Sequence, residues 1–591
     1  MNNPAPATAL RTALAALLLF LAVLLAYQPA FPGCFIWDDD SQLLENALIH
    51  DPDGLRRIWF STEPLEYYPL YYTSLRLQWH WFGPHPAGYL SVNLALHGLN
   101  AILLMFLLRR LRGPIPLLAA ALFALHPVNV FSVAWINQHK TVLSTTFYLA
   151  SLLCFARSAR QSSADRAAEL QPTPFACSSG APPPEDLPGQ ASGWLALAFV
   201  FFVTGLLTKP TLILLPVFMA LAGSLIYRRR GWTLWAPLAP FFALALAAGL
   251  LRVVWHPPPL ADALEPPRID GWGAHLIVPG RAVWFYLTRL LWPRGLMIVY
   301  PKWALSSAAA ISYLPSLLGL AALVVLWRTR NRWPAGFLGY SFFLLGLFPV
   351  LGFFDNQYFT FSYVANHWLY APMMGMAALA AILIGSGHSS RTAWARYFIT
   401  LLLLLGLLLL ARGEASRFRD PFDYYERGVA ENPDNVVAHQ NLANLYREAG
   451  HPDQALPHYL EAVRIHPTFW KARNDAAAML IETGAFPEAM EQLQASLKIF
   501  PENPEAHFRL GTLLGQLGQN EAAIRHLQEA VGLNPADPVA FGNLGIAYFN
   551  VGRLDMAEAC FREALQLKPD YDAARRNLGL VLQQQAPSQT R

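Results

Sequence analysis

The chain has 591 residues, which is too long for one ordinary domain and predicts at least two. Its composition is 54% hydrophobic and 14% charged, against about 25% charged residues in soluble domains. The net charge of +4 is small and basic residues lie in short loops, so we expect no nucleic-acid partner. The four cysteines lie far apart without a CxxC or histidine pairing, which argues against a disulfide framework and a zinc site.

Long apolar runs dominate residues 1–412, and the rest of the chain has the composition of a soluble helical protein. A bilayer span takes about 20 apolar residues, and shorter spans survive inside a bundle. The first run, Thr12–Tyr27, has the length of a signal-peptide core. Because similar runs recur throughout this part, we expect a first membrane helix and not a removed leader. The predicted spans are eleven, at about 10–30, 88–108, 115–131, 141–156, 193–208, 211–227, 233–254, 308–327, 335–353, 368–386 and 396–411.

Arginines gather in the short loops on one side of these spans. Since positive residues favour the cytoplasmic side, we expect a cytoplasmic N-terminus and, with an odd number of spans, a C-terminus outside the cytoplasm. The loop 157–192 is rich in Ser, Ala and Pro, including Ala181–Glu185, and is predicted to be a flexible cytoplasmic linker. The arginines of four such loops are Arg109, Arg110 and Arg112; Arg157, Arg160 and Arg166; Arg228–Arg230; and Arg328, Arg330 and Arg332.

Residues 413–591 contain a repeat with a step of 34 residues. Prolines recur at this step from Pro433, glycines from Gly450 and alanines from Ala455, which is the tetratricopeptide pattern. Stacked repeats share one core and present a concave surface, so we expect a bound peptide or protein segment. The predicted repeats are 436–469, 470–503, 504–537 and 538–571, with a half-repeat at 421–433 and a capping helix at 572–585.

The first outer segment begins with three consecutive carboxylates, Asp38, Asp39 and Asp40. Their mutual repulsion and the nearby lipid predict a raised pKa for at least one of them. Such a carboxylate would act as a general base toward a hydroxyl, or would anchor a divalent cation such as Mg²⁺ or Mn²⁺. Equally open is a capping role for Asp39 or Asp40 at the start of a following helix.

Cations and histidines of the other outer segments could meet a phosphate. Lys209 lies between two apolar spans, where an ionisable residue is either functional or reaches for the membrane surface. Arg281 and Arg289 are eight residues apart and fall near one helix face, and either could bind a phosphate with its planar guanidinium. His367 could bind or protonate a departing phosphate. Further polar candidates are His126, His139 and Lys140.

The order of these motifs resembles one family. Trp37–Asp39 is similar in position to the acidic motif of GT-C-fold glycosyltransferases, and the repeats follow the apolar part as in the bacterial relatives of the transmembrane and tetratricopeptide-repeat-containing (TMTC-like) O-mannosyltransferases. The other motifs of the resemblance are Tyr68-Pro69-Leu70, Asn93, His97, Asn100, His126-Pro127, Trp135-Ile136, Thr208-Lys209-Pro210, Leu291-Trp292-Pro293, Tyr300-Pro301 and Ala365 to Pro372.

This resemblance implies an all-α protein, with a polytopic GT-C-like bundle over 1–412 and a tetratricopeptide solenoid over 413–591. It implies an inverting transferase that moves a sugar, mannose by analogy, from a polyprenyl-phosphate donor to a hydroxyl of an exported protein held by the repeats. It also implies a bacterial inner membrane with periplasmic repeats. The implied roles are Asp39 or Asp38 as base, Lys140, Lys209, Arg289 and His367 at the donor phosphate, and Asp40, His126, His139 and Arg281 in support.

Two other classes of protein stay open. A non-catalytic scaffold would use the repeats to assemble envelope or secretion complexes, and dispensable carboxylates at 38–40 would favour it. A transporter or flippase of lipid-linked glycans would place ionisable residues in mid-span near broken helices. Few such residues occur here, so the run of carboxylates favours the enzyme.

Overall fold

The computed structural model describes residues 6–31, 33–64, 66–111, 115–169, 190–254, 271–354, 357–385 and 393–585. These residues form helices and turns without a β-strand, which confirms the predicted all-α class. They divide into two compact units, a first unit that reaches Asn432 and a second that begins at Pro433. The two units are described separately below.

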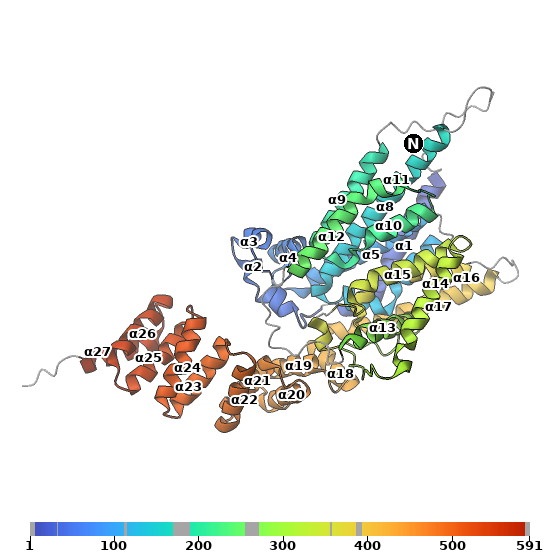
Figure 1. Cartoon of the computed structure of the whole chain (residues 1–591). Helices are drawn as coiled ribbons and strands as arrows, with labels where there is room; N and C mark the ends of the chain where they lie inside the picture. Colours follow the sequence, from blue (N-terminus) through green and yellow to red (C-terminus); the bar gives the residue numbers. More distant parts are fainter. Residues whose placement is uncertain are drawn as a thin grey trace, which may run out of the picture. The chain divides into compact units, whose positions relative to one another are not determined.

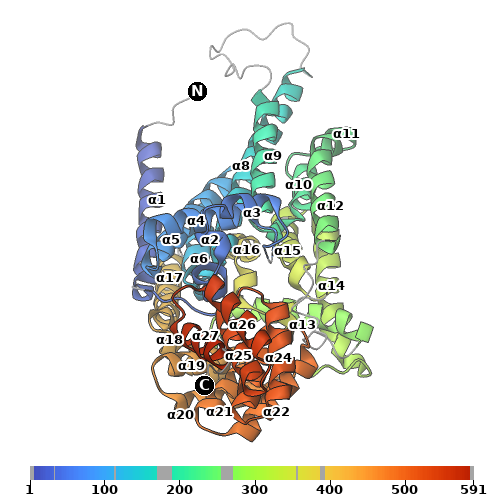
Figure 2. The same ribbon diagram turned by 90° about the vertical axis from the view of Figure 1, so that its left-hand side faces the viewer.

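The first unit is a bundle of apolar helices (Figure 1). Helices α8 and α9 run side by side, as Figure 2 also shows. The helices are α1 Pro6–Tyr27, α2 Ala47–His50, α3 Gly54–Phe60, α4 Pro69–Phe82, α5 Pro86–Arg110, α6 Pro116–Leu125, α7 Val130–Val133, α8 His139–Glu169, α9 Gln190–Thr208, α10 Leu215–Leu225, α11 Trp232–Trp235, α12 Ala239–Val254, α13 Ala274–Leu291, α14 Leu314–Thr329, α15 Pro334–Leu347, α16 Met373–Gly385, α17 Ala393–Ala415 and α18 Pro421–Glu431.

Each of the eleven predicted spans is occupied by an apolar helix or helix pair of this unit. Among the described residues, seven helices are long and apolar enough to cross a membrane. An eighth candidate is the pair α6 and Pro127–Val133, which bends by 54° at His126 because Pro127 cannot continue the helix. Three shorter apolar helices, Leu215–Leu225, Pro334–Val350 and Met373–Gly385, correspond to the remaining predicted spans.

The predicted linker 157–192 is partly helical. Helix α8 continues to Glu169, and α9 already begins at Gln190. Ala181–Glu185 lies outside the described residues, as do Arg112 and the side chain of Arg166. The helical continuation of α8 has a physical reason, because Ser, Ala, Arg and Gln around 157–169 are all compatible with a helix and no proline interrupts them.

The second unit is a stack of antiparallel helix pairs with the predicted period (Figure 1). Glycines that end the first helix of each pair have positive φ angles, for example +80° at Gly484. Alanines of the second helices, such as Ala489, are fully buried, because a larger side chain would separate the pair. The helices are α19 Val436–Glu448, α20 Pro452–Ile465, α21 Trp470–Glu482, α22 Phe486–Ile499, α23 Pro504–Gln516, α24 Asn520–Leu533, α25 Pro538–Asn550, α26 Leu554–Leu567 and α27 Asp572–Gln585.

Helix α18 coincides with the predicted half-repeat, but it belongs to the first compact unit. Arg417, just before α18, donates to the backbone oxygen of Leu296 and forms ion pairs with Glu414 and Glu431. Asn432, just after α18, donates its amide to the backbone oxygen of Val299 at 3.1 Å. Both ends of α18 are therefore attached to the segment that follows α13, and the boundary between the units lies after residue 432, beyond the expected position at 412.

Candidate functional site

The acidic segment 38–40 folds into a tight turn, and hydrogen bonds to the side chain of Asp39 hold this turn in place. The side chain of Asp39 is 1% exposed. One carboxylate oxygen accepts from the backbone N–H of Ile36 at 2.9 Å, and the other accepts from the backbone N–H of Asn137 at 2.7 Å. Burial raises the pKa of Asp39, and these two donors oppose that rise. Asp39 thus ties the turn to the start of α8 and does not cap the following helical turn.

Asp38 differs from Asp39 because it is only partly buried and has one weak hydrogen-bond donor. Its Oδ2 atom lies 3.3 Å from the side-chain nitrogen of Asn137. Burial raises the pKa of Asp38, the positive charge of Lys140 lowers it and the negative charge of Glu66 raises it. Asp38 is therefore a partly exposed carboxylate with a raised pKa, which are two properties that a general base needs. Asp40 is exposed at the start of the next turn.

Lys140 and Glu66 form an ion pair beside this carboxylate. The ammonium of Lys140 lies 3.2 Å from Glu66, and the Lys140 side chain is only 11% exposed. It also lies 5.5 Å from the ring centre of Tyr71, within the range of a cation–π contact. Lys140 is thus held in place before any substrate arrives. The negative charge of Glu66 offsets part of the lowering effect of Lys140 on the pKa of Asp38.

A second cationic group, Lys209, lies on the side of the site that carries His367. The Lys209 ammonium donates to the hydroxyl of Thr141 at 2.9 Å. His367 is buried between aromatic rings, with the ring of Trp135 at 5.5 Å. Burial and then the charges of Lys209 and Lys140 lower the pKa of His367 well below its usual range. His367 is therefore neutral at neutral pH, and the positive charge here comes from the two lysines.

The histidines His126 and His139 have structural partners on both ring nitrogens. His126 accepts from the backbone N–H of Val128 and lies 3.1 Å from the backbone oxygen of Leu290. His139 contacts the hydroxyl of Ser74 and the side-chain oxygen of Asn93, each at 2.8 Å. Neither ring presents a nitrogen to a substrate: His126 joins the bend after α6 to the end of α13, and His139 holds the turn that carries Asn137 and Lys140.

Several motif residues of the family resemblance form a buried polar network behind the same turn. The amide of Asn100 donates to the backbone oxygen of Val142 at 3.0 Å and to the hydroxyl of Tyr370 at 3.1 Å. His97 contacts the same hydroxyl at 2.8 Å. These residues connect α5, α8 and the segment before α16, and thereby fix the backbone from which Lys140 and His367 extend.

Arg281 and Arg289 lie on α13 but apart from Asp38. Arg281 donates to the backbone oxygen of Ala304 at 3.1 Å. Arg289 lies over the rings of Phe285 and Tyr300, at 5.0 and 5.4 Å from their centres. The hydroxyl of Tyr300 donates to the side-chain oxygen of Asn366 at 2.8 Å, which places Arg289 one aromatic layer from the residue before His367.

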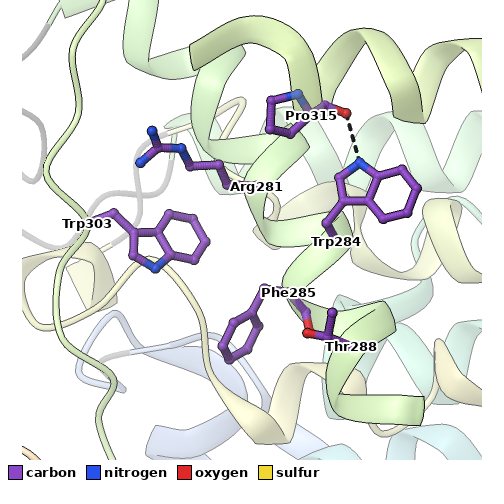
Figure 3. Close-up of a pocket in the computed structure, with 6 residues that line it drawn as sticks. All are labelled: Arg281, Trp284, Phe285, Thr288, Trp303 and Pro315. Carbon is purple, nitrogen blue, oxygen red and sulfur yellow. Dashed lines mark hydrogen bonds between the residues drawn. The ribbon is translucent and has the colours of Figure 1, made fainter. Parts of the chain in front are cut away.

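An open, mostly apolar pocket of about 390 Å³ lies against α13 (Figure 3). The Arg281 side chain extends toward the wall that carries Trp303, and Trp284 on the opposite wall donates its indole N–H to the backbone oxygen of Pro315 at 3.0 Å. Phe285 contributes to the pocket and also packs edge-on against Tyr300 at 4.7 Å. Phe285 is therefore shared between the pocket lining and the aromatic contact with Tyr300. Its lining residues are Arg281, Trp284, Phe285, Thr288, Trp303 and Pro315.

Within the described ranges, no group of three or more His, Cys, Asp or Glu side chains is arranged to hold a metal ion. The carboxylates nearest one another around Lys140 are those of Asp38 and Glu66, and the lysine lies close to both. A divalent cation at Asp38 thus stays a prediction of the sequence.

Three features of the site were not predicted from the sequence: Glu66 as the partner of Lys140, Asn137 as the partner of Asp38, and the backbone conformation of Trp37. Glu66 lies three residues after Glu63 at the start of an aromatic segment, and no spacing links it to Lys140. Trp37 has a φ of +52°, which no sequence pattern indicates for a tryptophan.

Comparisons with known proteins agree with the repeats. Models of the tetratricopeptide repeat match residues 424–456, 441–504, 480–538 and 538–571. Among solved structures, YrrB, described as a tetratricopeptide protein with an unusual peptide-binding site, is 27% identical with a TM-score of 0.26, and the match covers 27% of this chain and 82% of YrrB.

Curated proteins similar to this chain are protein O-mannosyl-transferases, and two of those named here match more than three quarters of it. TMTC1 of Homo sapiens is 24% identical over 540 residues, covering 78% of this chain and 56% of TMTC1. F38B6.6 of Caenorhabditis elegans is 22% identical over 481 residues, covering 77% of this chain and 63% of that protein. TMTC4 of Mus musculus is 26% identical over 164 residues, covering 23% of this chain and 22% of TMTC4.

The chain spans less than two thirds of the length of each of these relatives. The longer matches nevertheless include both the apolar helices and the repeats, since they cover more than three quarters of this chain. The described part of the chain thus has seven helices apolar enough to span a membrane and a set of tetratricopeptide repeats, and over more than three quarters of its length the chain is similar to TMTC protein O-mannosyl-transferases.

Proposed function

We propose that this protein transfers a sugar, mannose by analogy with the names of its relatives, from a polyprenyl-phosphate donor to a hydroxyl group of an exported protein. The observation that carries the proposal is the environment of Asp38. It is a partly exposed carboxylate whose pKa is raised by burial and lowered by the charge of Lys140, in a site where burial and the charges of Lys209 and Lys140 keep His367 neutral. A base beside fixed positive charge is the arrangement that displacement at a sugar phosphate needs.

The proposed reaction is a single displacement. Asp38 takes the proton of a Ser or Thr hydroxyl as its oxygen bonds to the anomeric carbon of the sugar. The bond from that carbon to the phosphate oxygen breaks on the opposite face, its electron pair stays on the polyprenyl phosphate, and the anomeric configuration inverts. Lys209 and Lys140 stabilise the developing phosphate charge, and because both are already held by Thr141 and Glu66, little rearrangement is required.

We propose that the pocket along α13 receives part of the donor's hydrocarbon chain. Its lining is aromatic and apolar, with Arg281 as the charged residue among the six that line it, and Phe285 connects it to the aromatic layer beside Asn366. We propose that the chain lies between Trp284 and Trp303, with Arg289 nearer to the phosphate. The repeats would hold the acceptor protein on the same side of the membrane, which we propose is the periplasmic face of a bacterial inner membrane.

The test is sugar transfer by the purified full-length protein in detergent or nanodiscs, with polyprenyl-phosphate mannose and exported proteins of its own host. Asp38→Asn should abolish transfer, whereas Asp40→Asn, which removes the exposed carboxylate of the same run, should keep most of it. Equal transfer by Asp38→Asn and the unmodified protein would exclude Asp38 as the base. No transfer with several lipid-linked sugars would favour a non-catalytic scaffold.

Treatment with EDTA, followed by Mg²⁺ or Mn²⁺, tests the metal alternative in the same assay. Because Lys140 already neutralises the carboxylates around it, we expect transfer to persist in EDTA. Loss in EDTA and recovery with either cation would place a divalent ion in the reaction.

A further inference from the structure

The turn that presents Asp38 is held in an unfavourable backbone conformation. Trp37 has a φ of +52°, in the left-handed region that tryptophan rarely adopts because its Cβ crowds the backbone. Such strain persists only where the surrounding structure over-determines it. Because Trp37 precedes Asp38 directly, the conformation of Trp37 sets the direction in which the Asp38 carboxylate extends.

Both the ring and the backbone N–H of Trp37 are held by neighbouring residues. Its indole ring stacks on Trp135 with ring centres 5.3 Å apart and an angle of 13° between the planes, and it also meets the rings of Tyr358 and Phe361 at 6.0 and 6.1 Å. Its backbone N–H donates to the phenol oxygen of Tyr425 at 2.6 Å. Ile36 and Asp39 flank Trp37 and Asp38, and the backbone N–H of Ile36 donates to the carboxylate of Asp39. The Tyr425 bond is therefore the one hydrogen bond among the described residues that fixes the Trp37 amide directly.

Tyr425 is itself rigidly placed. It lies on α18 and is 2% exposed. The neighbouring Tyr424 packs against Phe418, whose ring meets Phe131 at 5.8 Å. The attachments of Arg417 and Asn432 to the segment 296–299 fix both ends of the helix.

Resting on the proposed function, we infer that Tyr425 is a positioning residue for the reaction: it holds Trp37 in its left-handed conformation so that Asp38 points at the acceptor hydroxyl. Tyr425 touches no reacting atom in this account and acts through the turn. The helix that the repeat pattern assigns to the tetratricopeptide array is thereby a component of the acidic site.

Tyr425→Phe removes the phenol oxygen and keeps the packing. We expect kcat to fall by about threefold to tenfold, the range that one hydrogen bond supplies, with KM for donor and acceptor unchanged. The matched control is Tyr424→Phe, the same change one residue earlier on α18, which should leave kcat unchanged. An equal effect of both variants, or none for Tyr425→Phe, would overturn the inference.

One further readout separates positioning from a general loss of structure. Fluorotryptophan at position 37 gives a readout that needs no activity. Its ¹⁹F resonance should shift in Tyr425→Phe and stay in place in Tyr424→Phe, so an inactive wild type would refute the proposed function while the positioning of Trp37 is still decided.

Discussion

The side-chain nitrogen of Asn137 lies 3.3 Å from the carboxylate of Asp38. The backbone N–H of the same asparagine donates to Asp39 at 2.7 Å, so one residue distinguishes two adjacent carboxylates. Asp39 receives two main-chain donors and is enclosed, whereas Asp38 receives one side-chain donor and is left accessible. This difference separates the predicted roles of the two residues.

We expect the Asp38→Asn and Asp39→Asn variants to lose sugar transfer for different reasons. Asp38→Asn should abolish transfer with an unchanged melting temperature. Asp39→Asn should lower stability by about 1–3 kcal/mol, because the amide can accept only one of the two buried backbone N–H groups and leaves the other unpaired. Thermal unfolding of both purified variants, measured beside the transfer assay, checks this. A stable but inactive Asp39→Asn protein would place Asp39 in the chemistry.

The charges around Asp38 predict opposite shifts of the pH profile. A general base works when ionised, so transfer is lost as pH falls through the raised pKa of Asp38. Lys140→Met removes the charge that lowers this pKa and should move the acidic limb of kcat/KM to higher pH. Glu66→Gln removes a charge that raises it and should move the limb to lower pH. Shifts in the same direction for both variants would contradict this electrostatic account.

We expect that His367 does not change its charge near neutral pH and so does not affect the pH dependence of transfer there. Its lowered pKa keeps the ring neutral, so it protonates only when the pH falls well below the usual range of histidine. We expect the pH profile of His367→Gln between about pH 6 and 8 to run parallel to that of the unmodified protein, as the usual pKa lies near 6.5. A limb near neutral pH that disappears in His367→Gln would show instead that the histidine acts as an acid.

The α13 pocket predicts a dependence on the length of the donor chain. Trp303→Ala removes a wall of the pocket and should raise KM about tenfold for a long-chain donor, since a large apolar contact is lost, and leave KM for a short-chain donor unchanged. Trp292→Ala is the control, because Trp292 is 66% exposed and does not line the pocket. Equal effects of the two substitutions would place the hydrocarbon chain elsewhere.

Two glycines of the repeats predict opposite effects on local stability. Gly484 has a φ of +80°, so Gly484→Ala should destabilise its repeat by about 1–2 kcal/mol. Gly579 lies inside α27 with free space at its Cβ position, so Gly579→Ala should stabilise that helix by about 0.5–1 kcal/mol. Hydrogen exchange of the full chain measures both. Faster exchange of α27 in Gly579→Ala would contradict the helical account.

The repeats could be predicted because Pro, Gly and Ala recur at one step of 34 residues, where they mark helix ends, turns and close helix contacts. The apolar helices could be predicted because their hydrophobic residues form continuous runs in the sequence. The separate roles of Asp38 and Asp39 could not be predicted, because the donors that distinguish them come from Asn137, far along the chain. The sequence indicated the carboxylates at 38–40, but only the fold shows that Asp39 is buried and that Asp38 is partly exposed.

Helix α18 illustrates a second limit of prediction from sequence. Its sequence fits the start of a repeat array, and residues 424–456 match a tetratricopeptide model. Sequence periodicity describes a helix's shape and spacing but not which neighbour covers its apolar face. Here Tyr424 and Tyr425 are covered by Phe418 and the turn at Trp37, so the helix belongs to the first unit.

Because the first compact unit ends at Asn432, Tyr425 lies in the same unit as the carboxylate turn, whereas the 34-residue repeats lie in the other. Under the proposed function, removal of one repeat should therefore weaken acceptor binding and leave the bond between Trp37 and Tyr425 as it is. A truncation that reaches α18 should remove that bond as well.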